Sequence, residues 1–121
     1  MSSDSPVIDP QALENLRALS PDDGDEFIRE IFAIFLEDTP KRIEELDQSL
    51  AAKDSPKFVR AAHSIKGSSA NLGALALKTA SERLENQSRK TGLEDVAALV
   101  ADVKLEFERA KAAIDELIKP A

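Results

Sequence analysis

Residues 55–73 read Ser-Pro-Lys-Phe-Val-Arg-Ala-Ala-His-Ser-Ile-Lys-Gly-Ser-Ser-Ala-Asn-Leu-Gly. Residues that suit a buried face recur in this stretch at steps of three and four, the period of one side of a helix: Phe58, Ala61, Ala62, Ile65, Ser69 and Leu72. Ser55 before Pro56 predicts the start of the helix, because serine is a good N-cap and proline suits the first turn. Gly73 predicts its end. The stretch therefore indicates an amphipathic helix with one buried face.

The sequence before this stretch predicts two more helices. Asp9 and Pro10 form a second cap-and-proline start, for a short helix that ends near Ser20. A longer apolar pattern then begins at Glu26 and continues to Leu50. Pro40 lies inside this pattern, and we expect a kink or a tight bend near Asp38 and Thr39.

The sequence after Gly73 predicts a fourth and a fifth helix, separated by a turn at Thr91 and Gly92. The fourth helix has Leu77, Ala80 and Leu84 on one face. The fifth covers residues 93–117, is ended by Pro120, and has the most regular pattern of the chain, with apolar steps of three and four: Leu93, Val96, Val100, Val103, Phe107, Ala110, Ile114 and Leu117.

No segment has the alternating, β-branched pattern of a strand. Because turns of a few residues join long helices, neighbouring helices should pack antiparallel. The predicted fold is therefore all-α: an antiparallel up-down four-helix bundle with a short additional N-terminal helix. We expect residues 1–8 to be a disordered tail or the end of a linker, and residues 9–119 to form the bundle.

Composition sets further limits. The chain has 121 residues, enough for one core, and 42% of them are hydrophobic. It has no apolar run near the roughly 18–20 residues of a membrane span, and no signal peptide pattern. The absence of cysteine excludes disulfides and thiolate metal sites, and fits a cytoplasmic protein. We predict no contact with a membrane.

Charge is distributed unevenly along the chain. The net charge is −7, yet residues 53–90 carry eight Lys and Arg against three acids. The only basic stretch is therefore the one around His63, the single histidine, and it would attract an acidic partner or a phosphate. Nucleic acid would be repelled by most of the remaining surface, and the basic stretch has no interleaved aromatic residues, so no nucleic-acid partner is expected.

A helical projection places His63 on the side of its helix opposite Phe58 and Ile65, with Lys66, Gly67 and Ala70 around it. Imidazole is largely neutral and nucleophilic near neutral pH, so it can take up a phosphoryl group. Lys66 could attract that group and stabilise its charge. A glycine inside an exposed helix face costs about 1 kcal/mol relative to alanine, which suggests close approach of another surface at Gly67.

Simpler interpretations of these residues stay open. His63 could be an ordinary exposed histidine, Lys66 a solvated charge, and Gly67 a helix C-cap, although the apolar face continues past Gly67. The chain has no Gly-rich phosphate loop and no Walker lysine motif. It also lacks a second histidine or a cysteine that would complete a metal site, and no catalytic triad is evident, so no metal or cofactor bound by this chain is expected.

His63 with Lys66 and Gly67, followed by Gly73 and set in this helical layout, resembles the histidine-containing phosphotransfer (HPt) domains of multistep phosphorelays. The resemblance implies that His63 accepts a phosphoryl group at Nε2 from a receiver-domain aspartate and passes it to the aspartate of another receiver. Lys66 would stabilise the phosphoryl group and Gly67 would let the receiver approach. The resemblance implies a phosphotransfer intermediate without autonomous ATP-dependent kinase activity, and Mg²⁺ would belong to the receiver.

The resemblance also implies a docking surface and partners. Docking would involve Gly67 with Val59, Arg60 and Ala70, and more weakly Arg83 or Arg89. Glu85 or Asn86 would hydrogen-bond Nδ1 of His63, a choice that stays open. The expected partners are response-regulator receiver domains and a hybrid sensor histidine kinase, and a monomer is expected.

Three alternatives to the relay stay open. The first is the phosphoacceptor domain of a chemotaxis-type histidine kinase, which looks similar but is phosphorylated by an ATP-binding kinase domain. The second is a non-catalytic helical docking bundle with an unused histidine. The third, a metal-binding bundle, would need inward Glu and His pairs, whereas the acids mostly lie off the apolar stripes.

Overall fold

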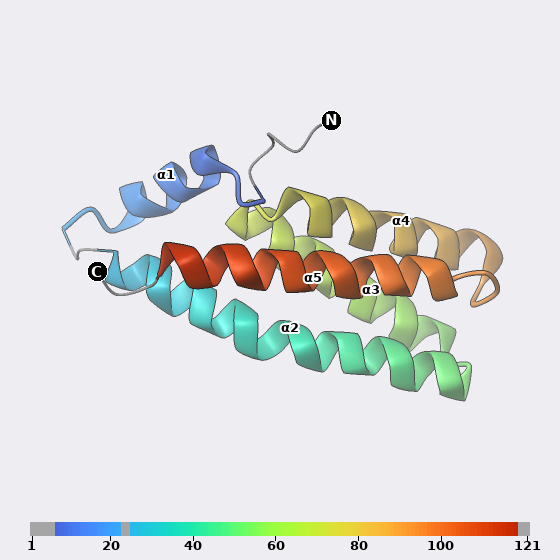
Figure 1. Cartoon of the computed structure of the whole chain (residues 1–121). Coiled ribbons are helices and arrows are strands. Elements are labelled where there is room, and N and C mark those ends of the chain that lie inside the picture. Colours follow the sequence, from blue (N-terminus) through green and yellow to red (C-terminus); the bar gives the residue numbers. More distant parts are fainter. Residues whose placement is uncertain (1–6, 23–24, 119–121) are drawn as a thin grey trace.

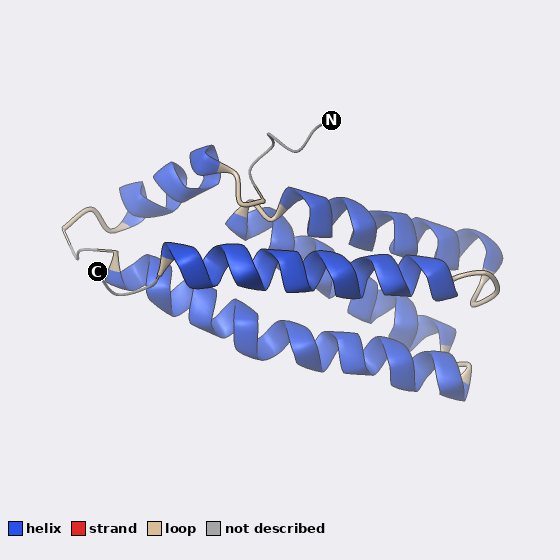
Figure 2. Cartoon of the chain, viewed as in Figure 1, coloured by secondary structure: helices blue, strands red, loops and turns tan. Residues whose placement is uncertain are grey.

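The computed structural model describes residues 7–22 and 25–118. Within them the chain forms five helices: α1 (Pro10–Leu19), α2 (Glu26–Ala52), α3 (Ser55–Leu72), α4 (Leu75–Thr91) and α5 (Ala97–Leu117). Figure 1 shows α2 to α5 running up and down as an antiparallel bundle, with the shorter α1 across one end. Figure 2 shows no strand among these residues, and the predicted all-α bundle with an additional N-terminal helix is confirmed.

Local capping explains the start of α1 and both ends of α3. The Asp9 carboxylate accepts a hydrogen bond from the backbone N–H of Gln11, and Pro10 is the first residue of α1, as predicted. In α3 the cap is one residue earlier than predicted, because Asp54 rather than Ser55 accepts the N–H of Lys57. Gly73 ends α3 in the left-handed region with φ 76°, as its position in the sequence predicted.

α2 is one continuous helix with Pro40 inside it, so the chain makes no tight bend near Asp38 and Thr39, and a kink within the helix stays a prediction. The predicted start of the last helix is wrong, because α5 begins at Ala97 rather than at residue 93. Leu93 fits the apolar period of α5, but it lies in a turn that includes Asp95 with φ 58°. Its side chain packs on the core from this turn and not from the helix.

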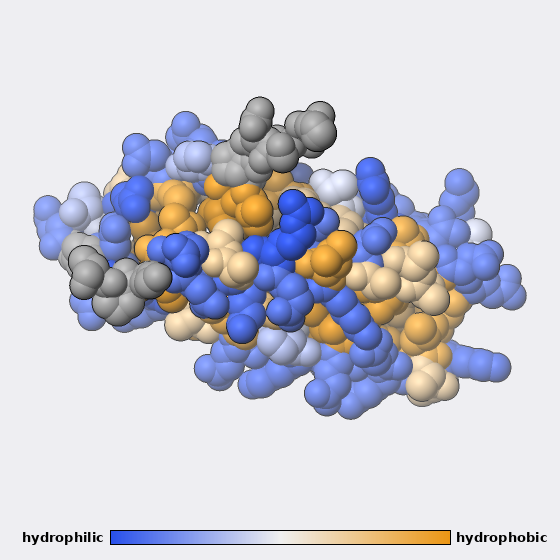
Figure 3. All heavy atoms as spheres, in the orientation of Figure 1, coloured by the Kyte–Doolittle hydropathy of each residue, from blue (hydrophilic) through white to orange (hydrophobic). Residues whose placement is uncertain are grey.

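All five helices contribute buried side chains to one core. The Phe35 ring of α2 and the Phe107 ring of α5 lie 5.9 Å apart in a tilted arrangement, which joins two helices distant in sequence. Figure 3 shows a mostly hydrophilic outer face with separate apolar patches. None of the helices in the described part of the chain is long and apolar enough to cross a membrane.

The packed part of the chain begins before residue 9. Ile8, which the sequence assigned to the tail, is 5% exposed and forms an isolated antiparallel bridge with Ala74. The N–H of Asp9 donates to the Gly73 carbonyl at 2.8 Å. The segment before α1 is therefore fixed to the α3–α4 connection; residues 1–6 and 119–121 lie outside the described residues.

Candidate functional site

His63 projects from the exposed face of α3, as the helical projection predicted. Its side chain is 60% exposed, whereas Ala62 and Ile65 on the same helix are fully buried. The buried face of α3 holds the helix in the bundle and leaves the imidazole toward solvent. A large partner can therefore reach this ring without any rearrangement of the fold.

Glu85 of α4 orients the imidazole. Its Oε2 lies 2.9 Å from Nδ1 of His63, and its side chain is only 4% exposed. Asn86, the other candidate that the sequence left open, is exposed. An ionised carboxylate can only accept a hydrogen bond, so the Nδ1–H of the ring must donate to it. The lone pair is then on Nε2, the ring nitrogen that points away from Glu85.

Two cations compensate the charge of Glu85. Lys66 Nζ lies 2.9 Å from Oε1, and Arg89 donates to Oε2 from Nη2 at 2.8 Å and from Nε at 3.2 Å. Burial raises the pKa of the Glu85 carboxyl, but hydrogen bonds from Lys66, Arg89 and His63 outweigh it and lower the pKa to about 2. Glu85 is therefore ionised at neutral pH.

The backbone brings these residues together through the α3–α4 pair, which makes the most extensive helix contact in the bundle. Ser69 on α3 and Ser88 on α4 are small and buried. Their hydroxyls donate to carbonyls of their own helices, Ser69 to Ile65 at 2.6 Å and Ser88 to Glu85 at 2.9 Å, so neither is left without a partner. Close packing therefore places a buried Glu85 within reach of an exposed His63.

No contact within the described residues explains why position 67 is a glycine. It lies inside α3 rather than at its end, and a Cβ built on it would meet nothing within 4 Å. The C-cap interpretation is therefore wrong. Arg60 and Ala70 are also exposed on this helix, whereas Val59 is half-buried. These residues form the exposed surface around His63 that the sequence assigned to docking.

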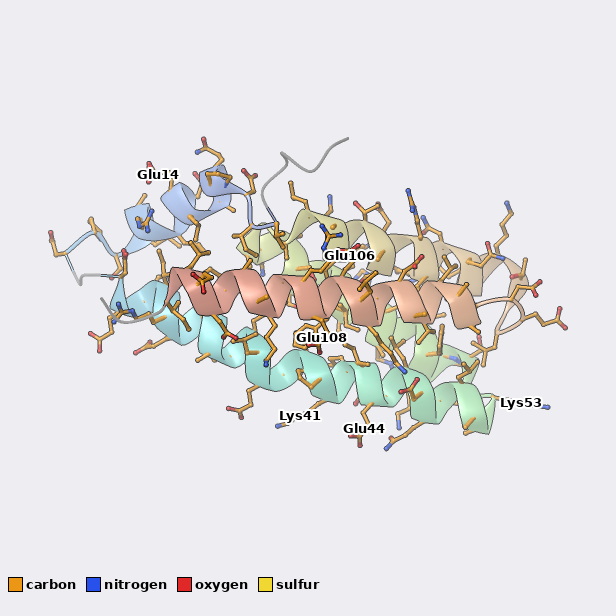
Figure 4. The ribbon with its side chains drawn as sticks, viewed as in Figure 1. Glu14, Lys41, Glu44, Lys53, Glu106 and Glu108 are labelled. Carbon is orange, nitrogen blue, oxygen red and sulfur yellow. The ribbon has the colours of Figure 1, made fainter. Side chains whose placement is uncertain are left out.

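Arg83 is not part of this surface. It lines a groove of about 420 Å³ with Asp102 and Glu106 of α5. Figure 4 shows Glu106 on the side of α5 that faces α4, and Glu108 on the side that faces α2. Of the two arginines that the sequence offered as weaker docking candidates, Arg89 joins the site through Glu85, whereas Arg83 lines the groove toward α5.

An apolar groove between α1, α2 and α3 was missed by the sequence analysis. It has a volume of about 460 Å³, and Leu19 and Ile34 in its wall are 70% and 66% exposed. On α3 it includes Ser68, which directly follows Gly67, and Asn71, which lies one turn further along. Ile34 could have indicated this groove from the sequence, because this isoleucine lies off the buried stripe of α2. The groove therefore continues the exposed surface around His63.

The site offers little to a metal ion. Glu85 is its only buried carboxylate, and each of its oxygens already faces a cation or an N–H donor. Within residues 7–22 and 25–118, no three histidine, aspartate or glutamate side chains are grouped so that they could hold a metal. What the arrangement presents is an oriented imidazole nucleophile beside two positive charges.

The comparisons with known proteins agree with this geometry. A family model described as the Hpt domain matches residues 30–115. The chain is 34% identical over 83 residues to multistep phosphorelay regulator 1 of Schizosaccharomyces pombe, a match that covers 69% of this chain but only 28% of that protein.

Solved structures are similar over nearly the whole chain. One is histidine-containing phosphotransfer protein B from Pseudomonas aeruginosa PAO1, with TM-score 0.83 and 28% identity, covering 93% of this chain and 94% of that one. A histidine-containing phosphotransfer protein from maize has TM-score 0.82 at 24% identity, covering 93% and 83% of the two chains. The maize protein supports the fold alone.

Proposed function

The chain belongs to the Hpt domain family, and we propose that His63 is the phosphoacceptor of a phosphorelay. Nε2 takes a phosphoryl group from the aspartyl phosphate of one receiver domain and gives it to the aspartate of another. The observation that carries this proposal is the contact between Glu85 and Nδ1 of an exposed imidazole. A histidine without such a role would not require a buried carboxylate behind it.

The transfer step follows from the tautomer that Glu85 selects. The Nε2 lone pair attacks phosphorus, and the P–O bond of the aspartyl phosphate breaks. The electron pair of that bond leaves with the aspartate of the receiver as a carboxylate. The Nδ1 proton stays in place, and the ring becomes a phosphorylated imidazolium facing the ionised Glu85.

The reverse step needs no proton transfer either. When a second receiver aspartate attacks phosphorus, the N–P bond breaks and its electron pair returns to Nε2. The leaving group is then a neutral imidazole that still carries its Nδ1 proton. Glu85 therefore serves both directions, because it stabilises the positive ring without taking its proton.

Lys66 and Gly67 support the same step in different ways. The Lys66 ammonium is one helical turn from His63 and can stabilise the charge of the phosphoryl group. The open space over Gly67 accommodates the surface of the partner. The Mg²⁺ that phosphoryl transfer requires would belong to the receiver, whose acidic pocket would hold it.

We assign receiver docking to the exposed face of α3 and to the apolar groove beside it. A partner that covers Gly67 reaches His63 on one side and Asn71 in the groove on the other. Substituting Ile34 by Glu should weaken receiver binding about tenfold or more, since an apolar contact is lost and a charge is buried. Leu105→Glu is the matched control, because Leu105 is 57% exposed on α5 and does not line the groove. Equal losses in both variants would argue against this docking surface.

The proposed function is tested by phosphotransfer from purified phosphorylated receivers with Mg²⁺. The wild-type chain should gain one acid-labile, base-stable phosphate, and His63→Gln should gain none while keeping its helical content. Labelling of His63→Gln would place the phosphate elsewhere. A folded wild type that accepts nothing from any receiver of its organism would favour a non-catalytic docking bundle.

The proposal includes a monomer that works in the cytoplasm. A cysteine-free chain is compatible with a reducing compartment. Sedimentation equilibrium measures the oligomeric state, and a stable dimer at micromolar concentration would contradict this part. A hybrid sensor histidine kinase as upstream donor is tested by using its receiver domain as one of the phosphorylated donors.

A further inference from the structure

One buried carboxylate contacts three side chains of the site. Glu85 contacts Nδ1 of His63 and the guanidinium of Arg89 through Oε2, and the ammonium of Lys66 through Oε1. Lys66 and Arg89 therefore lie on the Nδ1 side of the ring. Nε2, where the phosphoryl group would form, points away from this cluster.

This arrangement creates a requirement for Lys66. To neutralise a phosphoryl group on Nε2, its ammonium must leave Glu85. Glu85 is 4% exposed, and removing one partner from a buried charge is strongly unfavourable unless another cation remains. The phosphorylated ring contributes one positive charge at Oε2. A further cation on the same carboxylate is needed to replace the charge that Lys66 takes away from it.

Arg89 meets this requirement. It lies four residues after Glu85 on α4 and donates to Oε2 through two nitrogens, so its contact does not depend on Lys66. We propose that Arg89 is a positioning residue, which holds the charge of Glu85 while the Lys66 ammonium moves from Glu85 to the phosphoryl group on His63. This inference rests on the proposed function of His63.

The exchange involves ion-pair partners only, and no covalent bond changes. Lys66 lies three residues after His63 on the same helix face, and its side chain is 26% exposed, so its long stem can turn toward solvent. A phosphoryl group carries more negative charge than a carboxylate and draws the ammonium away. When the phosphoryl group leaves, Lys66 returns to Oε1.

The test measures the equilibrium of phosphotransfer between this chain and one receiver. Arg89→Gln should shift the equilibrium toward the phosphorylated receiver by about tenfold, because Lys66 is then the only side chain left to neutralise both the Glu85 charge that Arg89 had balanced and the phosphoryl group. Arg89→Lys should restore most of the wild-type value. Arg83→Gln is the matched control, since Arg83 lies on the same helix but lines the groove toward α5.

A double variant distinguishes this role from simple attraction of phosphate by Arg89. A chain that already carries Lys66→Gln has no ammonium that can move from Glu85 to the phosphoryl group. In that chain, adding Arg89→Gln should shift the phosphotransfer equilibrium less than about threefold. If the two substitutions act independently, Arg89 works by direct attraction and the proposal is wrong. It is also wrong if Arg89→Gln equals Arg83→Gln.

A spectroscopic readout separates positioning from structural damage. In unphosphorylated Arg89→Gln, the ¹⁵N signals of the His63 ring should still report a proton on Nδ1, since Glu85 keeps Lys66 as its counter-ion. Loss of this tautomer would mean that Arg89 only maintains the local structure, which overturns the inference. Failure of the wild type to accept phosphate would instead contradict the proposed function itself.

Discussion

Gly67 and Gly73 belong to the same helix and have opposite surroundings. Gly73 ends α3 with φ 76°, and a Cβ built on it would lie 2.5 Å from the Cβ of Ala12 and 3.0 Å from that of Asp9. Gly67 has ordinary helical geometry, and a Cβ there would meet nothing within 4 Å. The fold requires the first glycine, and nothing within the described chain requires the second.

The difference separates residues that build the domain from residues that face a partner. Gly73 allows the segment before α1 to pack against the α3–α4 connection, where Asp9 donates to its carbonyl. Gly67 lowers the stability of α3 and leaves space beside His63. Glu85 belongs to both groups, since it is buried like a core residue but ionised and directed at the exposed histidine.

The largest effect on stability is expected from Gly73→Ala. Alanine is strained at positive φ, and its Cβ would push α1 away, so the free energy of unfolding should fall by about 3 kcal/mol. Urea unfolding measures the loss. Ala12→Gly, combined with Gly73→Ala, removes the closest contact and should recover part of it. If the double variant loses the sum of the two single effects, contact with Ala12 is not the cause.

A smaller effect is expected from the titration of Glu85. Its pKa is about 2 in the folded protein and near 4.5 when unfolded, so its stabilising contribution is present above about pH 4.5 and is lost as the pH falls toward 2. Between about pH 6 and about pH 3, wild type should lose about 2 kcal/mol more than Glu85→Gln. Urea unfolding of both proteins across this range provides the measurement. Parallel pH curves would mean that the contacts of Glu85 do not favour its ionised form.

The sequence predicted the features that are determined within a single helix, namely its exposed face and its ends. The exposure of His63 follows from the position of Phe58 and Ile65 on the same helix, so a helical projection was sufficient. The starts at Asp9 and Pro10 and the end at Gly73 follow from local capping chemistry. These features need no knowledge of how helices pack.

The parts that depend on packing between helices could not be predicted. Whether Glu85 or Asn86 reaches His63, and whether Arg83 or Arg89 joins it, depends on how α4 is rotated against α3. Leu93 continues the apolar period of α5, but its side chain packs on the core from a turn. Val7 and Ile8 form an apolar pair too short to show any period.

The smallest effect on stability is expected at Gly67, where function and fold should respond in opposite directions. Gly67→Ala should leave the fold unchanged and raise the free energy of unfolding by about 0.5–1 kcal/mol, because alanine is the better helix former and the space is open. Gly67→Gln should be similarly stable. Its longer side chain should slow phosphotransfer about tenfold or more, since overpacking of a close contact costs about 1–3 kcal/mol.

Urea unfolding and single-turnover transfer from one phosphorylated receiver separate these two effects at Gly67. Ala101→Gln, on the exposed face of α5, is the matched control for an added glutamine side chain. Transfer by Gly67→Gln at the wild-type rate would mean that no partner surface approaches there. A large loss of stability would instead mean that Gly67 serves the fold, as Gly73 does, and the distinction between the two glycines would no longer hold.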